Sequence, residues 1–374
     1  MIVGYDAKRL FHNYTGLGYY SRTLVSSLQE YNPGFHPVLF DHHPVENTLT
    51  KPFFEQTQFS IASLKAPSWY YRSINLNNNL RYRKIDLYHG LSNELPLIKL
   101  SNRIPAVVTI HDVLYRSFHE DFPWLDRQIY DLKTKSALKN ADVVVAISEA
   151  TKAEILRHFP SAEKKIKVVY QSYDPLFDQP VSSELLQSEL LKYNLPSEYV
   201  LYVGAITRRK NLGVLIKALK LIREESRPAL LVAGKGTIYE KKIKSLIADL
   251  QLTKWIHFIP DLPRTTIRIL YSGAKAIIYP SLGEGFGLPV IESIAANTPV
   301  ITSNLSSMPE AGGSLATYFD PSNVEQLAYC IESVNKPDFQ KSNESIRKQH
   351  LEKFSRKRIA EQYMNEIYLP LISY

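Results

Sequence analysis

Short apolar runs rich in valine and isoleucine recur along the whole chain of 374 residues, separated by longer stretches with helical spacing. The runs are continuously apolar instead of alternating, which is typical of parallel strands buried on both faces of a sheet. Repeated strand–helix–strand units of this kind predict an α/β fold with doubly wound parallel sheets. The expected strands span residues 1–6, 36–41, 85–90, 105–112, 142–148, 166–170, 198–204, 228–234, 255–260, 275–281, 298–303 and 314–319, with helices between them, for example at 211–225 and 239–250.

The series of strands restarts near residue 198, after a polar stretch at about 172–196. The chain is also about twice the length of a typical domain, so we expect two Rossmann-like domains. Ligands of such sheets bind beyond the carboxyl ends of the strands. Two of these edges facing each other would form an interdomain cleft.

The stretch SLGEGFGLPVIES at 281–293 joins an expected strand to an expected helix whose first residue is Pro289. Its glycines let the backbone approach a ligand, and the helix start offers free N–H groups to an anion. Glu284 and Glu292 flank this loop, and carboxylates accept hydrogen bonds from paired sugar hydroxyls. The pattern therefore suits a nucleotide-sugar, in which a diphosphate joins two sugars. The alternative is an ordinary glycine-rich connection with a glutamate near the helix start.

Two further loops support a ligand site. Arg208, Arg209 and Lys210 follow the strand at 198–204 and precede a helix, a position that suits a phosphate. Gly16 and Gly18 open a helix after the first strand and would let a ligand approach the backbone. Taken alone, the basic turn also fits a solvated surface, and the glycine pair does not complete the dinucleotide fingerprint.

Two histidines stand at the ends of neighbouring strands. His111 ends the strand at 105–112 and is followed by Asp112, whereas His89 ends the strand at 85–90. At a carboxyl strand end, a histidine could donate a hydrogen bond or shuttle a proton. A structural role in the core is the alternative for both.

The amino-acid composition excludes several classes of protein. The single cysteine, Cys330, excludes an intrachain disulfide and a cysteine metal cluster. No apolar run is long enough to span a bilayer, and the N-terminus lacks the pattern of a signal peptide, so we expect a cytoplasmic protein. A net charge of +8 favours anionic partners such as nucleotides or an acidic membrane face. We expect no nucleic-acid partner.

These stretches together resemble the family-four retaining glycosyltransferases of group 1, which have the two-domain glycosyltransferase B fold. The pair of glutamates in EGFGLPVIE, with seven residues between them, is the most specific element. The resemblance implies an acceptor-binding domain at 1–175, a nucleotide-sugar-binding domain at 176–354, and a C-terminal helix at 355–374, formed by about 355–368, that crosses back to the first domain. The other matching stretches are TGLGYYSRTLV, DLYHG, VVTIHDV, ADVVVAISEATKAEI, IKVVY, LYVGAITRRKNL, LLVAGKG, IIYPS, SIAANTPVITS and KFSRKRIAEQYMNEIY.

The resemblance also implies roles for individual residues. Glu284 would contact the transferred sugar, Glu292 would bind the ribose hydroxyls, and His111 would approach the donor sugar. Arg209 and Lys210 would neutralise the leaving diphosphate. Contacts to the donor or near the acceptor are implied for Gly285, Phe286, Gly287, Leu288, Gly16 and Gly18.

The implied chemistry is retention by front-face attack, in which the leaving phosphate oxygen takes the proton of the acceptor. Cations and helix N–H groups aimed at the diphosphate stabilise the charge that develops there. The chain has no Asp-x-Asp pair, so we expect no metal, and no cofactor beyond the donor substrate. The chain departs from the family pattern in its basic loop TRRKN, in QSYDP after the sixth strand, and at Arg356, where a tryptophan is common.

We therefore expect a transferase that moves a hexose, such as mannose, from a nucleoside diphosphate to a glycan or lipid-linked acceptor in cell-surface polysaccharide synthesis. A nucleotide-sugar 2-epimerase of the same fold is the main alternative, and a nucleotide-sugar binder or an NAD dehydrogenase fits fewer features. Aromatic and basic residues at 67–84 suit peripheral contact with an anionic membrane, although a surface helix fits them too. We expect base contacts from the backbone at 234–236 and 260–262.

Overall fold

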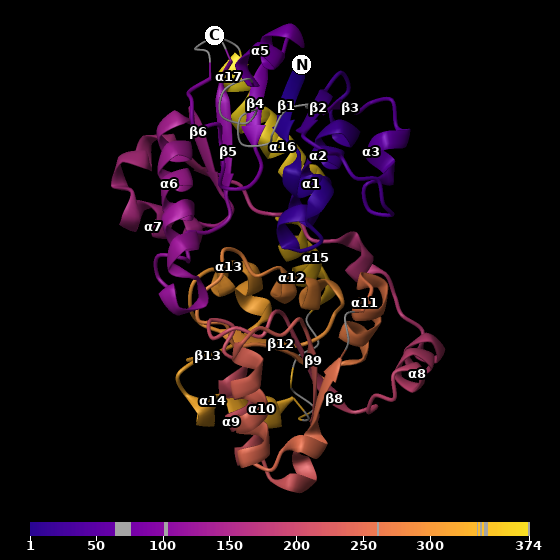
Figure 1. Cartoon of the computed structure of the whole chain (residues 1–374). Helices are drawn as coiled ribbons and strands as arrows, with labels where there is room; N and C mark the ends of the chain where they lie inside the picture. The colour runs from indigo at the N-terminus through magenta and orange to yellow at the C-terminus, as the bar shows by residue number, and fades with distance from the viewer. Residues whose placement is uncertain are drawn as a thin grey trace. The chain divides into compact units, whose positions relative to one another are not determined.

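The computed structural model describes residues 1–63, 76–100, 104–259, 262–334, 336, 339 and 343–372. Contacts divide the chain into two compact units (Figure 1): unit 1 comprises Met1–Ser172 and Lys353–Tyr374, and unit 2 comprises Tyr173–Glu352. Residues 67–75 of the aromatic and basic stretch at 67–84, and Pro260 and Asp261 of the expected base-contact segment, lie outside the described residues.

Within the described residues, unit 1 contains a seven-stranded parallel sheet in the order β3-β2-β1-β4-β5-β6-β7. Chain order reverses between β1 and β4, as in a doubly wound sheet. The five inner strands are almost entirely buried, which explains their continuously apolar sequences, whereas the edge strands β3 and β7 are partly exposed. Their bounds are β1 (Ile2–Asp6), β2 (His36–Asp41), β3 (Ser60–Ser63), β4 (Leu87–Gly90), β5 (Ala106–Ile110), β6 (Val143–Ala146) and β7 (Ile166–Val168).

Helices cover both faces of this sheet, and the two hydrophobic clusters of unit 1 lie between helices and strands. The capping Ser148 accepts a hydrogen bond from the Thr151 N–H and fixes the start of α7. The helices are α1 (Lys8–His12), α2 (Gly16–Tyr31), α3 (Lys51–Glu55), α5 (Leu76–Tyr82), α6 (Trp124–Asn140), α7 (Glu149–His158), α16 (Arg356–Gln362) and α17 (Leu369–Ile372), with 3-10 turns at His119–Asp121 and Pro160–Lys165 and a π-helical segment, η8, at Tyr363–Tyr368.

Unit 2 repeats the architecture with a six-stranded parallel sheet in the order β10-β9-β8-β11-β12-β13 over its described residues. The strands are β8 (Tyr199–Val203), β9 (Ala229–Ala233), β10 (Ile256–Ile259), β11 (Ile277–Tyr279), β12 (Val300–Ser303) and β13 (Thr317–Phe319). The helices are α8 (Ser183–Lys192), α9 (Leu212–Leu221), α10 (Tyr239–Asp249), α11 (Arg264–Gly273), α12 (Leu288–Ala295), α13 (Met308–Gly312), α14 (Val324–Ser333) and α15 (Glu344–Glu352), with 3-10 turns at Pro175–Asp178, Glu224–Ser226, Thr253–Trp255 and Gly313–Leu315.

The predicted α/β class with doubly wound parallel sheets is confirmed, with corrections at the level of elements. The sequence analysis missed β3, because SIAS is half polar and pairs only with β2 at the edge of the sheet. The helix expected at 211–225 ends at Leu221, and its tail forms a 3-10 turn. Pro289 occupies the second position of α12 instead of the first, because Leu288 begins the helix.

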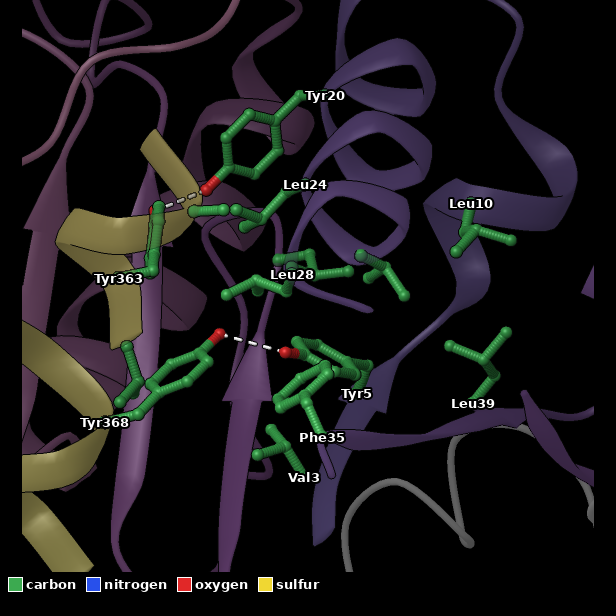
Figure 2. Close-up of a cluster of buried hydrophobic side chains, with 14 of the residues drawn as sticks. Val3, Tyr5, Leu10, Tyr20, Leu24, Leu28, Phe35, Leu39, Tyr363 and Tyr368 are labelled. Carbon is green, nitrogen blue, oxygen red and sulfur yellow. Dashed lines mark hydrogen bonds between the residues drawn. The ribbon is translucent and has the colours of Figure 1, made fainter. Parts of the chain in front are cut away.

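The C-terminal segment of unit 1 packs against helix α2. Arg356, at the start of α16, donates hydrogen bonds to Ser27 Oγ at 3.0 Å and to Glu30 Oε2 at 2.8 Å, both on α2. Figure 2 shows Tyr363 and Tyr368 of η8 reaching into the core, where their hydroxyls meet those of Tyr20 and Tyr5. No helix among the described residues combines the length and the apolar character needed to cross a bilayer.

Candidate functional site

The basic loop and the glutamate loop of unit 2 follow neighbouring strands. The basic residues come after β8, and the glutamate loop comes after β11, which pairs with β8 through Leu201 and Ile277. Chain order reverses between these two strands, and ligands of doubly wound sheets bind at this switch point. A backbone hydrogen bond of 2.8 Å from the Leu282 N–H to the Arg209 carbonyl holds the two loops together.

Glu284, Arg209 and Lys210 form one ion cluster at this point. Arg209 Nη1 lies 2.8 Å and Lys210 Nζ 2.9 Å from the same oxygen, Glu284 Oε1. Ser281 Oγ donates to that oxygen as well, at 2.7 Å. Lys210 Nζ also donates to the Tyr279 hydroxyl at 2.6 Å. The three charged side chains are 12–16% exposed, so their interactions are weakly screened.

The cluster carries one more positive than negative charge. Burial raises the pKa of the Glu284 carboxyl, but Lys210 and Arg209 outweigh burial and lower this pKa to about 2. The carboxylate is therefore ionised at neutral pH and neutralises one of the two cations. The remaining positive charge lies at the carboxyl end of a parallel sheet, where it favours an anionic group of a ligand.

The loop around Glu284 is held rigidly. The Glu284 carbonyl accepts hydrogen bonds from Ser306 Oγ at 2.8 Å and Ser307 Oγ at 3.0 Å. Gly287 precedes α12 with φ of 107°, and a Cβ there would lie 2.8 Å from Met308 Cε, so only glycine fits. Phe286 is buried beside it. The sequence gave no signal for these serines, because they lie between β12 and α13, in a separate segment of the chain.

Glu292 lies on α12, buried and paired with a cation that the sequence analysis also missed. Arg264 Nη2 donates to Glu292 Oε1 at 2.7 Å, and the Tyr271 hydroxyl donates to Oε2 at 3.4 Å. Arg264 also bonds Asp174 at 3.1 Å and stacks over the Phe177 ring. Arg264 is the first residue of α11, where the helix dipole disfavours a cation. In the sequence, a cation at a helix start indicates that an acidic partner lies near it.

His111 lies in unit 1 directly after β5, with both ring nitrogens engaged. Its Nε2 is 2.9 Å from the Leu91 carbonyl, which can only accept, so Nε2 carries the proton. Its Nδ1 is 3.4 Å from Gln171 Nε2, and Tyr20 packs edge-on at 4.6 Å between ring centroids. Burial lowers the pKa of His111 to about 4, although its bond to Leu91 opposes this. The ring is neutral at neutral pH, and its only N–H bonds Leu91, so this arrangement does not favour proton shuttling.

A pocket of about 180 Å³ adjoins His111 within unit 1. Polar side chains from several elements line it, among them Arg9, Asp112 and the ion pair of Lys133 with Glu94, whose atoms are 3.0 Å apart. Leu17, which lies between Gly16 and Gly18, lines it too. The structure therefore brings His111 and the first turn of α2, which contains Gly16 and Gly18, together at one pocket. The charged and polar side chains that line this pocket can bond hydroxyl groups of a ligand.

The two glycines of this loop differ in their surroundings. A Cβ on Gly18 would lie 1.8 Å from the Asn13 carbonyl oxygen, and the Gly18 N–H donates to Asn13 Oδ1 at 2.9 Å. Gly18 is therefore required by the packing of α2 on the preceding turn. A Cβ on Gly16 would meet nothing within 4 Å. A ligand contact by either glycine stays a prediction.

Lowering the pH from 6.5 to 5 is expected to destabilise unit 1 by about 2 kcal/mol for each of two buried histidines. Burial lowers the pKa of His89 to about 3 and that of His111 to about 4, from the usual 6.5. Below 6.5 the unfolded chain binds protons that the folded chain excludes, so stability falls as the pH falls toward 4. Urea unfolding at pH 7, 6 and 5 measures this loss.

His89→Gln, which removes one titrating group, should flatten this dependence. If His89→Gln keeps the wild-type slope, the loss of stability arises from other groups.

Comparison with known proteins decides the family. The model described as Glycosyltransferase Family 4 matches residues 14–175, and the model described as Glycosyl transferases group 1 matches residues 187–352. O-antigen chain mannosyltransferase B of Escherichia coli is 30% identical over 261 residues, which are 68% of this chain and 67% of the relative. The chain belongs to the group 1 glycosyltransferases.

Another relative of this glycosyltransferase is O-antigen chain mannosyltransferase RfbU of Salmonella typhimurium, 26% identical over 77% of this chain and 79% of the relative. Among solved structures, a glycosyltransferase from Rickettsia africae has a TM-score of 0.74 at 21% identity, covering 99% of this chain and 98% of that one. Sucrose-phosphate synthase from Thermosynechococcus elongatus has a TM-score of 0.74 at 20% identity, covering 100% and 99%. These likenesses show the glycosyltransferase B fold, and the 2-epimerase alternative is not supported.

Proposed function

We propose that this glycosyltransferase moves mannose from a nucleoside-diphosphate mannose to a glycan or lipid-linked acceptor during the synthesis of a cell-surface polysaccharide. The observation that carries the proposal is the relationship to two O-antigen mannosyltransferases, each matched over at least two thirds of its length. We also propose that the enzyme acts in the cytoplasm, as the sequence analysis expects.

The ion cluster of unit 2 supports a diphosphate donor. In the free enzyme Glu284 pairs with both Arg209 and Lys210 and neutralises one of the two positive charges. An incoming diphosphate would therefore replace a carboxylate as the partner of these cations and also meet the remaining positive charge. As the bond between sugar and phosphate breaks, negative charge develops on the leaving diphosphate, and the two cations stabilise it. Glu284, released from one cation, is then available to the hydroxyls of the sugar.

The proposal includes retention of the anomeric configuration and no metal. The acceptor hydroxyl attacks the anomeric carbon on the face that the diphosphate leaves, and the proton passes to the leaving phosphate oxygen. Arg209 and Lys210 supply the positive charge that a metal would otherwise bring, and the sequence lacks an Asp-x-Asp pair. Glu292, beside Arg264, is the proposed partner of the ribose hydroxyls.

We expect the purified enzyme to release a free nucleoside diphosphate only when donor and acceptor are both present. The assay offers nucleoside-diphosphate mannose with mannose-terminated oligosaccharides, follows the nucleotide by chromatography, and assigns the new linkage by NMR. An α-linked product from an α-linked donor, formed equally in the presence of a chelator, is the expected result. Inversion at the anomeric carbon would refute retention, and a change at C2 of the sugar without acceptor would refute transfer itself. Nucleoside-diphosphate glucose is the matched control donor.

A further inference from the structure

Arg264, the first residue of α11, joins two carboxylates of unit 2. Its Nη2 donates to Glu292 Oε1 at 2.7 Å, and its Nε donates to Asp174 Oδ2 at 3.1 Å. Glu292 lies on α12, whereas Asp174 stands just before the 3-10 turn at Pro175–Asp178. The guanidinium therefore ties three separate segments together through two different nitrogens, a geometry that the single nitrogen of a lysine does not offer.

The position of the guanidinium is fixed by partners other than Glu292. Asp174 Oδ1 accepts a hydrogen bond of 3.0 Å from the Leu176 N–H, so the backbone of the turn fixes this carboxylate. The guanidinium of Arg264 also lies over the buried Phe177 ring, 5.2 Å from its centroid. An anchored carboxylate and a cation–π contact thus restrict Arg264, although its side chain is 46% exposed.

Arg264 and Tyr271 leave Glu292 with a defined capacity for further hydrogen bonds. The Tyr271 hydroxyl donates to Oε2 at 3.4 Å, and burial raises its pKa well above the usual 10, so it remains a donor. An ionised carboxylate has about four acceptor positions, two on each oxygen. Arg264 occupies one on Oε1 and Tyr271 one on Oε2, which leaves one on each oxygen. Two adjacent hydroxyls, as on a ribose, require such a pair of positions.

We propose that Arg264 is a positioning residue that sets the selectivity of this glycosyltransferase for a ribonucleotide over a 2′-deoxyribonucleotide. It fixes Glu292 before the ligand arrives, and so removes the cost of ordering a long side chain on binding. The inference rests on the proposed function, in which Glu292 is the partner of the ribose hydroxyls. Asp174 belongs to QSYDP, at which the chain departs from the family pattern, so the family resemblance alone does not account for this anchor.

The formal charges of the two clusters of unit 2 fit the two parts of the donor. Arg264, Asp174 and Glu292 together carry one positive and two negative charges. The Glu284 cluster carries two positive charges and one negative charge. The anionic diphosphate is attracted to the positive cluster, whereas the neutral ribose hydroxyls donate well to the carboxylates of the negative one.

Calorimetry with matched nucleotides tests this role. The diphosphates of adenosine, guanosine, cytidine and uridine are titrated first, and the tightest ligand is then compared with its 2′-deoxy counterpart. The wild type should bind the ribonucleotide at least about tenfold more tightly, because the deoxy compound lacks a hydrogen bond to a charged acceptor. Arg264→Ala should reduce this ratio about fivefold and leave the affinity for the 2′-deoxynucleotide within about twofold. Asp174→Asn, which removes only the anchor, should reduce the ratio less.

Arg268→Ala is the matched control. Arg268 lies one turn further along α11 and donates to Gln179 Oε1 at 3.2 Å instead of to Glu292, so its removal should leave the wild-type ratio unchanged. In the transfer assay, Arg264→Ala should raise KM for the donor about fivefold and change kcat less than about twofold. A ribose contact is made equally in the ground state and the transition state, and the loss of such a contact appears in KM.

The outcomes separate failure of this inference from failure of the proposed function. A wild type that binds both nucleotides equally, or a Glu292→Gln variant with wild-type selectivity, would refute the ribose role of Glu292 and the inference with it. If Glu292→Gln loses the selectivity but Arg264→Ala retains it, only the role of Arg264 is wrong. An equal loss of affinity for both nucleotides in Arg264→Ala would show a purely structural role and would overturn the inference too.

Discussion

Lys210→Ala is expected to lower kcat for sugar transfer by about 10²- to 10³-fold, the usual cost of removing one preorganised charge from a developing anion. Lys210 is positioned for this role by two contacts, to Glu284 Oε1 at 2.9 Å and to the Tyr279 hydroxyl at 2.6 Å. The same change should weaken binding of a free nucleoside diphosphate, because one of the two cations at the switch point is lost. Steady-state kinetics and calorimetry measure the two effects.

Arg208→Ala provides the matched control. Arg208 lies in the same loop and carries the same charge, but its side chain is exposed, whereas that of Lys210 is only 14% exposed. We expect its removal to change kcat less than about threefold, within the range of surface charge effects. Equal losses in Arg208→Ala and Lys210→Ala would mean that the loop acts through its overall charge, and the specific role of Lys210 would be wrong.

Glu284→Gln separates binding from turnover. The carboxylate competes with a diphosphate for Arg209 and Lys210, so its neutral isostere should bind a nucleoside diphosphate at least as tightly as the wild type does. Turnover should nevertheless fall, since the amide is a weaker acceptor for the hydroxyls of the sugar. A variant with weaker nucleotide binding and unchanged kcat would reverse these assignments.

The sequence was sufficient to predict the described strands other than β3, and the loops that carry the ion cluster, because these depend on local patterns. Buried parallel strands are continuously apolar, and the ligand-side loops of such sheets follow the strands directly. The pairing of Glu284 with Arg209 and Lys210 was not predicted, although the three residues were chosen. That pairing depends on β11 lying beside β8, a long-range order that no local pattern contains.

Other parts of the candidate site depend on partners that are distant in the chain. Arg264 lies 28 residues before Glu292, and only the fold brings the guanidinium to the carboxylate. For His111 the sequence suggested hydrogen-bond donation or proton shuttling but no partner, and the structure shows that its N–H binds the Leu91 carbonyl. Backbone carbonyls carry no sequence signal, so such an engagement is visible only in the structure.

The C-terminal segment, α16 and η8, is another part whose form depends on partners distant in the chain. A helix at 355–368 was expected, but the chain forms α16 and then the π-helical segment η8. In an α-helix, Tyr363 and Tyr368 would point about 140° apart. The wider π turn brings both rings into the core, where the Tyr368 hydroxyl lies 2.7 Å from His89 Nδ1. In this turn both hydroxyls reach polar partners that are distant in the sequence, and local propensity does not reveal such partners.

Tyr363→Ala is expected to destabilise unit 1 by about 3–5 kcal/mol, the cost of deleting a fully buried aromatic ring. The ring is 0% exposed, and its hydroxyl lies 2.5 Å from that of Tyr20 and 3.1 Å from Thr109 Oγ1 (Figure 2 shows the bond to Tyr20). Hydrogen exchange followed by mass spectrometry should show faster exchange in β1 and α2. The amides of β8 and β9 report on unit 2 and should keep their rates.

One further variant separates the contribution of ring packing to stability from that of hydrogen bonding, and a second is a surface control. Tyr363→Phe keeps the ring and should cost only about 1 kcal/mol, because Tyr20 and Thr109 still bond each other at 2.9 Å. Tyr329→Ala removes a 64% exposed ring of unit 2 and should cost almost nothing. Tyr20 also packs edge-on against His111, so Tyr363→Ala should loosen that contact and lower transfer activity, whereas Tyr363→Phe should preserve it. Faster exchange in β8 and β9 equal to that in β1 would instead show that the segment stabilises the whole chain.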